Sequence, residues 1–216
     1  MVQRITPSAR LLYIAPDNAE EAIAQARWFC KNNVKEEPTP QQIQRAITNT
    51  LETGHVGVLE HAIASFEIDL SRVTSHQLVR HRMASYVQES QRAVAQVPDV
   101  ILPDSYEEIP LEYLERVMKF LDDAHGLYKG LQDAGMRRED ARYILPQCFA
   151  SCLRATANFR SWMHFLRLRL HVSAQDEIRD IAESIQSQLA ERCPSVFSME
   201  ALQRYVEVPE LTTSST

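Results

Sequence analysis

Glycine is scarce in this sequence, and that scarcity limits the folds open to it. The chain has five glycines in 216 residues. No segment matches the glycine-rich loops by which Rossmann and P-loop folds bring their backbone against a phosphate. A G-x-S-x-G nucleophile elbow and a C-x-x-C redox pair are also absent. The sequence therefore argues against both nucleotide-binding folds and offers no obvious activated nucleophile.

Strand signals are few and unevenly spaced along the chain. Residues 11–15 (LLYIA) form an apolar run typical of a buried strand, and residues 66–70 (FEIDL) alternate as a half-buried strand does. Segment 152–157 is ambiguous and compatible with a strand. Segment 84–97 lacks helical periodicity and fits either an irregular loop or a strand.

Helical periodicity and capping residues predict several helices between these segments. Asp17, Thr39 and Asn158 are candidate N-caps, and Ser173 with Asp176 resembles a capping box at the start of the last helix. The predicted helices run over 17–32, from Pro40 to a stop at Gly54, over 71–81, 111–130, 139–145 and 159–169, and from Ser173 to about residue 192. Because strands and helices interleave irregularly, we expect one α+β domain over residues 1–208, followed by a polar tail at 209–216.

Arginine carries almost all of the positive charge. Only four of the 23 basic residues are lysines, and the net charge is −6. Two windows, 70–88 and 141–175, contain no acidic residue, and they hold Arg72, Arg80, Arg82, Arg142, Arg154, Arg160, Arg167 and Arg169. The guanidinium group can bind phosphate or carboxylate through two hydrogen bonds. The windows therefore predict focused anion sites, unless these arginines pair with distant acids in the fold.

Three segments combine basic and amide side chains with few acids: 55–61, 77–92 and 158–169. This profile suits a phosphorylated, planar ligand, because arginines bind phosphates while amides and imidazoles meet ring edges. Ser85 and Ser90, near His81, allow a hydroxyl–base pair, but we favour the simpler interpretation that these serines donate hydrogen bonds to a ligand. His55 and His61 do not have a recognised metal spacing and fit a cleft better than a metal site.

The four cysteines, Cys30, Cys148, Cys152 and Cys193, are too dispersed for a zinc site. We interpret them as buried free thiols in a reducing cytoplasm. No apolar run is long enough to span a membrane, and the N-terminus lacks a secretory apolar region. The sequence thus predicts a cytoplasmic protein without a membrane partner.

Several motifs together resemble the flavin-dependent thymidylate synthase family. The signature is Arg80-His81-Arg82 followed by seven residues and Ser90. Around it, in the family's order, stand GHVGVLEH (54–61), ILPQC (144–148), NFRSWMHFLRLR (158–169) and AQDEIR (174–179). The resemblance covers about residues 45–200. It is specific because it rests on an ordered set of motifs.

The resemblance implies a fold, a reaction and its co-substrates. Family members methylate dUMP to dTMP with methylenetetrahydrofolate as the carbon donor. FADH2, regenerated by NADPH, gives the hydride, and no enzyme cysteine attacks the pyrimidine. The implied fold is a central, mostly antiparallel or mixed sheet flanked by helices. The implied assembly is a homotetramer whose active sites draw on several subunits, with neither nucleic acid nor a metal as a partner.

The resemblance also assigns site residues by motif position. The implied substrate ligands are Gln77, Arg80, Gln88, Glu89, Ser90, Gln91, Arg92, Arg142 from another subunit, and Arg169. Arg169 is the implied catalytic residue, polarising the uracil ring. The implied flavin ligands are His55, Gly57, Arg80, His81, Arg82, Met83, Gln88, Asn158, Phe159, Arg160 and His164.

The chain departs from the family pattern at three positions. Gly57 replaces a Ser or Thr, which removes a hydroxyl contact to the flavin. Gln88 replaces the Glu of some members, and Ala93 replaces a common aromatic.

Two rival hypotheses remain: a non-catalytic RNA or single-strand binder, and a homologue with a decayed site. The net negative charge and the 7% aromatic content disfavour the first, and the retained arginines disfavour the second.

Overall fold

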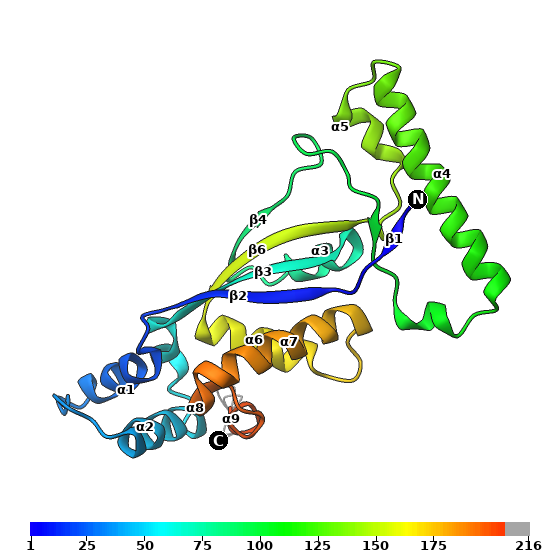
Figure 1. Cartoon of the computed structure of the whole chain (residues 1–216). Helices are drawn as coiled ribbons and strands as arrows, with labels where there is room; N and C mark the ends of the chain where they lie inside the picture. The colour runs from blue at the N-terminus through cyan, green and yellow to red at the C-terminus, as the bar shows by residue number, and fades with distance from the viewer. Residues whose placement is uncertain (206–216) are drawn as a thin grey trace, which may run out of the picture.

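A four-stranded antiparallel sheet lies at the centre of the structure, a computed structural model that describes residues 1–205 (Figure 1). Its strand order is β2-β3-β6-β4. The strands are β2 (Ser8–Ala15), β3 (Ile63–Ser71), β4 (Ser85–Gln88) and β6 (Ala150–Asn158). A separate parallel pair joins β1 (Gln3–Arg4) to β5 (Asp99–Val100). The predicted tail at 209–216 lies outside the described residues.

Helices gather on one face of the sheet and at its two ends (Figure 1). The α-helices are α1 (Ala19–Phe29), α2 (Pro40–Glu52), α3 (Arg72–Leu78), α4 (Leu111–Asp133), α5 (Arg138–Ala141), α6 (Phe159–Arg169), α7 (Asp176–Arg192), α8 (Pro194–Phe197) and α9 (Met199–Arg204). Three 3₁₀ helices complete the described chain: η1 (Val56–His61), η2 (Asp104–Glu107) and η3 (Arg142–Ile144). No helix within residues 1–205 is long and apolar enough to cross a bilayer. The predicted α+β fold with an antiparallel sheet is confirmed.

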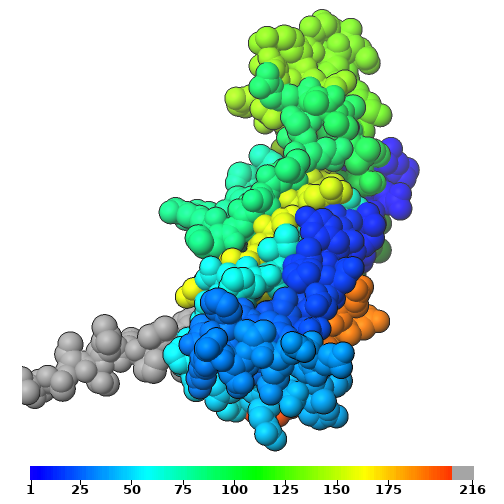
Figure 2. All heavy atoms as spheres, turned by 90° about the vertical axis from the view of Figure 1, so that its left-hand side faces the viewer, coloured from blue at the N-terminus to red at the C-terminus, as the bar shows by residue number. Residues whose placement is uncertain are grey.

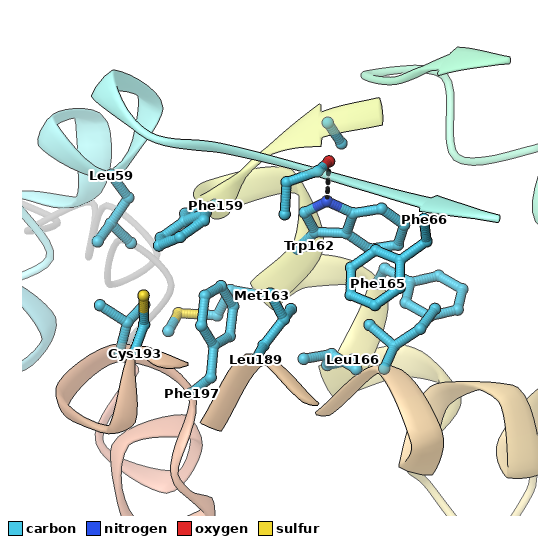
Figure 3. Close-up of a cluster of buried hydrophobic side chains, with 14 of the residues drawn as sticks. Leu59, Phe66, Phe159, Trp162, Met163, Phe165, Leu166, Leu189, Cys193 and Phe197 are labelled. Atoms are coloured by element: carbon cyan, nitrogen blue, oxygen red, sulfur yellow. Dashed lines mark hydrogen bonds between the residues drawn. The ribbon is translucent and has the colours of Figure 1, made fainter. Parts of the chain in front are cut away.

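The main core lies between the sheet and α6 and α7 (Figure 3). Strand alternation turns Phe66, Ile68 and Leu70 of β3 toward these helices, where each is fully buried. Trp162 of α6 stacks edge-on against Phe66 at 5.2 Å, and its indole nitrogen donates a hydrogen bond to the Ala64 carbonyl at 3.0 Å. This direct bond between α6 and β3 fixes the helix that carries much of the site.

The opposite face of the sheet is polar, and no helix of residues 1–205 lies over it. Arg10, Glu67 and Arg154 lie on adjacent strands, and the carboxylate is 2.5 Å from one guanidinium and 3.6 Å from the other. The Ser65 and Thr156 hydroxyls share a hydrogen bond of 2.8 Å. In Figure 2 these strands reach the surface between the two ends of the molecule. Helices therefore pack against one face of the sheet in the described part of the chain.

A smaller core lies at the far end, under α4. Its buried members are Val2, Val100, Leu102, Leu121 and Phe149. They join the β1–β5 pair to the inner face of α4, which extends three residues beyond the predicted end at residue 130. Leu121, His125 and Tyr128 are the buried residues of α4, and the helix lies well away from α1 and α2 (Figure 1).

Two predicted caps are wrong. The first helix begins after Asn18 rather than Asp17, and it ends at Phe29 rather than near residue 32. The predicted Ser173 capping box does not form, because the Ser173 hydroxyl bonds the His171 ring at 2.8 Å; Gln175 is the N-cap of α7. Nor is α7 the last helix, since α8 and α9 follow it. In both cases a neighbouring residue occupies the cap position that the sequence pattern assigned.

Other boundaries shift for local reasons. The helix predicted over 71–81 ends at Leu78, and the helix predicted over 139–145 divides into α5 and η3. The strand predicted over 11–15 is an edge strand, 8–15, with an irregularity between Leu11 and Tyr13, so it is less buried than its apolar run implied. Segments 152–157 and 84–97 both contain strands. Cys30 is exposed, against the expectation of a buried thiol.

The predicted Thr39 cap is confirmed, and it provides a stability test. The Thr39 hydroxyl accepts from the Gln42 amide at 3.3 Å, and the Gln42 side chain accepts from the Thr39 amide at 3.0 Å. We expect Thr39→Ala to lower the unfolding free energy by about 1 kcal/mol, because the Gln42 amide loses the hydroxyl acceptor of the cap. Thermal denaturation of Thr39→Ala measures the loss of stability. The control is Gln41→Ala, a change at an exposed position on the same helix. Equal melting temperatures for the two variants would contradict it.

Candidate active site

One cavity of about 740 Å³ lies where η1, α3, β4 and α6 meet. Segments far apart in sequence line it: the turn after α3, the junction of β6 with α6, and Tyr205 near the end of the described chain. It contains eight of the predicted site residues, namely Arg80, His81, Arg82, Met83, Asn158, Arg160, His164 and Arg169. All three predicted segments therefore contribute to one cavity, the first through Val56 and Glu60 of η1.

The end of α3 holds the Arg80–Arg82 segment by backbone and side-chain bonds. The amides of Arg80 and His81 donate to carbonyls in the last turn of α3, at 3.3 and 3.1 Å. The Tyr86 hydroxyl lies 2.8 Å from the His81 carbonyl and 3.0 Å from the Leu78 carbonyl. Burial raises the pKa of Tyr86 to about 12, so it stays a donor. The turn carrying the two arginines is thereby fixed from both sides.

Asn158 ends β6 and begins α6, as predicted. Its side-chain oxygen accepts from the Ser161 amide at 2.9 Å, which caps the helix. From this start, helical spacing places Arg160, His164 and Arg167 on the exposed side, while Trp162 and Leu166 are buried. The exposed side of α6 thus brings Arg160 and His164 to the cavity lining.

Arg169 and His81 are in direct contact inside the cavity. The Arg169 Nε donates to the His81 Nε2 at 3.1 Å, so this ring nitrogen must be unprotonated. Burial, together with the nearby charges of Arg169 and His164, lowers the pKa of His81 to about 4. The His81 ring also packs edge-on against Phe165 at 4.9 Å. A neutral imidazole therefore orients the predicted catalytic arginine.

An ion pair joins two sides of the cavity. Arg160 Nη1 lies 2.7 Å from a carboxylate oxygen of Glu60, which comes from η1. The hydrogen bond to Glu60 raises the pKa of Arg160, and Tyr205 adds to the effect. Glu60 therefore places an acid among the arginines and imidazoles of the cavity lining. An anionic ligand must compete with it for Arg160.

The remaining predicted substrate ligands lie outside the cavity lining. They are Gln77, Gln88, Glu89, Ser90, Gln91, Arg92 and Arg142. Gln77 bonds the side chain of Gln175, and Gln88 donates to the Ser151 hydroxyl at 3.0 Å. Glu89 and Gln91 line a separate recess of about 20 Å³.

Arg92 and Arg142 are held by one acid on α5. Arg92 Nε donates to the Glu139 carboxylate at 2.9 Å, and Arg142 Nε donates to the Glu139 carbonyl at 3.1 Å. The amide of Arg92 also donates to the Ser90 hydroxyl at 3.3 Å. Within one copy of the chain, these residues form a cluster of their own.

Besides Gln88, three predicted flavin ligands lie outside the cavity lining. His55, the N-cap of η1, and Gly57, within η1, are exposed, and a Cβ at Gly57 would meet nothing within 4 Å. Phe159 is fully buried and stacks edge-on against Phe197 at 4.8 Å (Figure 3), so its side chain belongs to the core. Glu60, Tyr86 and Tyr205 line the cavity without having been predicted. Glu60 stands within the GHVGVLEH motif, whereas nothing in the sequence indicates Tyr205.

The cavity suits the phosphorylated planar cofactor that the resemblance implies. Guanidinium groups of Arg80, Arg82 and Arg169 supply donors for phosphate, and apolar atoms of Met83 and Leu168 line the same space. A volume of 740 Å³ is typical of cofactor and drug-sized ligands. Residues 1–205 contain no group of three or more His, Cys, Asp or Glu side chains arranged to hold a metal.

The lowered pKa of His81 predicts a pH-dependent stability. The unfolded imidazole binds a proton near pH 6.5 and the folded one near pH 4, so the contribution of His81 is complete above pH 6.5 and is lost as pH falls toward 4. We expect wild-type protein to lose stability relative to His81→Gln across this interval, as measured by thermal denaturation. NMR titration gives a direct check, with His81→Gln identifying the resonance. A midpoint near 6.5 for His81 would contradict the geometry.

The comparisons with known proteins agree on one family. The family model for thymidylate synthase complementing protein matches residues 8–195. A flavin-dependent thymidylate synthase of Thermococcus onnurineus is 40% identical over 69% of this chain and 63% of its own length, so this chain spans under two thirds of that relative. One of Geobacter sulfurreducens is 36% identical over 87% of this chain and 84% of its own length.

A solved structure supports the fold. The UMP/dUMP methylase PolB of Streptomyces cacaoi, bound with 5-Br dUMP, superposes with a TM-score of 0.83 at 24% identity, covering 96% of this chain and 99% of that one. Sequence motifs, family model and relatives therefore agree, and this chain belongs to the thymidylate synthase complementing protein family.

Proposed function

We propose that this protein methylates dUMP to dTMP, with methylenetetrahydrofolate as carbon donor and NADPH as the source of electrons. In the balanced reaction, dUMP, methylenetetrahydrofolate, NADPH and a proton give dTMP, tetrahydrofolate and NADP⁺. The proposal rests on family membership, on relatives named flavin-dependent thymidylate synthase and on a structural neighbour described as a dUMP methylase. A reduced flavin, when bound, would supply the hydride that the new methyl group needs.

One observation carries the proposal: the cavity gathers arginines and imidazoles but no thiol. None of the four cysteines, all within residues 1–205, lines it. Burial raises the pKa of Cys148, of Cys152 to about 11 and of Cys193 to about 12, which makes each of them a poor nucleophile. A site of this kind suits methylation without a covalent bond between an enzyme cysteine and the pyrimidine.

Arg169 is the residue to which we assign polarisation of the uracil. Its Nε is bound to His81, and the rest of its guanidinium group lines the cavity. A fixed cation beside N3 and its neighbouring carbonyl stabilises negative charge that develops on the ring as hydride reaches C6. Because the neutral His81 already orients the group, little reorganisation is needed when substrate binds.

The cofactor in this proposal is FAD, held by the residues that line the cavity. Arg80 and Arg82 would bind its phosphates, while His81, Met83 and His164 would contact its ring system. Asn158 and Arg160 would complete the set, with Arg160 exchanging Glu60 for a phosphate oxygen. His55, Gly57, Gln88 and the backbone of Phe159 remain proposed contacts outside the lining.

We further propose a homotetramer in which each site draws on more than one copy. Within one chain, Arg92 and Arg142 cluster around Glu139, outside the cavity lining. A phosphate-binding role for Arg142 beside Arg169 therefore requires a second copy. Gln77, Glu89, Ser90 and Gln91 would complete the dUMP site at this junction.

The remaining parts of the proposal concern location and partners. Four unpaired cysteines suit a reducing compartment, which agrees with a cytoplasmic enzyme. A nucleic-acid binder is less well supported, because the two arginines on the open sheet face share Glu67 and do not form an unpaired basic stripe.

Arg169→Ala tests the catalytic assignment. We expect the variant to keep its fold and its flavin but to lose turnover by about 100-fold or more, because the uracil is no longer polarised. The assay measures formation of dTMP from dUMP with methylenetetrahydrofolate and NADPH, and the visible absorbance spectrum reports the bound flavin. Arg154→Ala, on the open sheet face, is the matched control. Normal turnover by Arg169→Ala would refute its assigned role.

Arg82→Ala tests the cofactor assignment separately. Removing one guanidinium from the cavity should reduce the FAD that copurifies with the protein and weaken FAD binding by about tenfold. Flavin absorbance per chain measures the FAD that copurifies, and fluorescence titration measures the FAD affinity. Arg154→Ala is again the control. Unchanged occupancy would exclude Arg82 as a flavin ligand.

A further inference from the structure

Glu177 is a buried acid that no step above uses. It lies in the first turn of α7 and is only 4% exposed. One carboxylate oxygen accepts from the Ser71 amide at 2.7 Å, and the other accepts from the Ser71 hydroxyl at 2.7 Å. Desolvating a carboxylate is unfavourable unless its oxygens are bonded, so this arrangement holds Ser71 in one position.

Ser71 is the point from which the arginine-bearing turn is built. It ends β3 and caps α3, where its hydroxyl oxygen accepts from the Thr74 amide at 3.1 Å. α3 has only seven residues, and its last turn is bonded to Arg80 and His81. If Ser71 shifts, we therefore expect α3 and the Arg80–Arg82 turn bonded to its last turn to shift with it.

Two segments of the site, which we call its two arms, meet at His81 and Arg169: the Arg80–Arg82 turn after α3, and the end of α6 that carries Arg169. The second arm is also bonded to the first turn of α7. α6 ends at Arg169, and a short turn leads from it to α7. Arg179 of α7 donates to the carbonyls of Val172 and Ala174, at 3.4 and 3.2 Å, which fixes that turn. Gln175, the N-cap of α7, also bonds Gln77 near the end of α3. The first turn of α7 thus contacts both segments whose side chains meet at His81 and Arg169.

We propose that Glu177 is a positioning residue that keeps the Arg80–Arg82 turn and Arg169 in register across the cavity. The contribution of Glu177 to turnover rests on the proposed function, whereas its contribution to the His81–Arg169 contact does not. Glu177→Gln is the sharpest substitution. Its remaining carbonyl oxygen can still accept from the Ser71 amide, but its NH₂ group cannot accept from the Ser71 hydroxyl.

The first measurement is independent of ligand and of activity. NMR titration follows His81 in wild type, in Glu177→Gln and in Glu183→Gln, an exposed acid two turns further along α7. When the two arms separate, His81 loses its cationic neighbour and part of its burial, so its measured pKa should rise by about 1 in Glu177→Gln alone. An unchanged His81 titration in a folded Glu177→Gln variant would overturn the proposal.

The second measurement separates positioning from general stability. At a temperature well below every melting transition, we expect Glu177→Gln to lower kcat about tenfold with a smaller change in KM for dUMP. Ser71→Ala should behave alike, and the double variant should be no worse than either single one, because both changes break the same contact. A lowered melting temperature with unchanged kcat would show a purely structural role and would refute positioning. Absence of turnover in wild type would refute the proposed function and leave the NMR result standing.

Discussion

The pairing of β3 with β6 is the constraint on which the rest of the structure depends. The two strands pair along their whole length, from Ile63 opposite Asn158 to Ser71 opposite Ala150. η1, which precedes β3, and α6, which follows β6, therefore lie at the same end of the sheet and form two walls of the cavity. At the other end, Ser71 starts α3. That helix and the turn after it lead back to β4, whose Ser85 pairs with Thr156 near the cavity.

This arrangement brings cations together in a protein whose net charge is negative. Arg80, Arg82, Arg160 and Arg169 all line one cavity, and mutual repulsion makes such a group unfavourable without an anion. Two features reduce the repulsion. Glu60 neutralises Arg160 directly, and His81 remains uncharged and accepts a hydrogen bond from Arg169. The cavity is therefore prepared for an anionic ligand while remaining stable without one, and the carboxylate and the neutral imidazole are as much part of it as the arginines.

Local signals in the sequence predict many of the helices and strands, and eight of the residues assigned by motif line one cavity, but neither kind of signal predicts long-range contacts. The caps at Thr39 and Asn158 form because their partners lie three residues away. The predicted caps at Asp17 and Ser173 do not form: α1 begins one residue later, after Asn18, and the Ser173 hydroxyl bonds the His171 ring while α7 begins after Gln175. Contacts across the fold left no local trace: Glu177 reaches Ser71 over more than a hundred residues, and Tyr205 joins the cavity from the end of the described chain. The segment over 88–92 was placed with the other site residues by resemblance, and within one copy its side chains lie outside the cavity lining.

The central claim is that one cavity binds both a flavin and dUMP. The most direct test is the visible absorbance spectrum of the purified protein, recorded before and after addition of FAD and then of dUMP. The account predicts a bound-flavin spectrum that changes when dUMP is added, because both ligands share the platform formed by Arg80 and Arg169. Absence of a flavin band even with excess FAD, or a flavin spectrum unaffected by saturating dUMP, would contradict it.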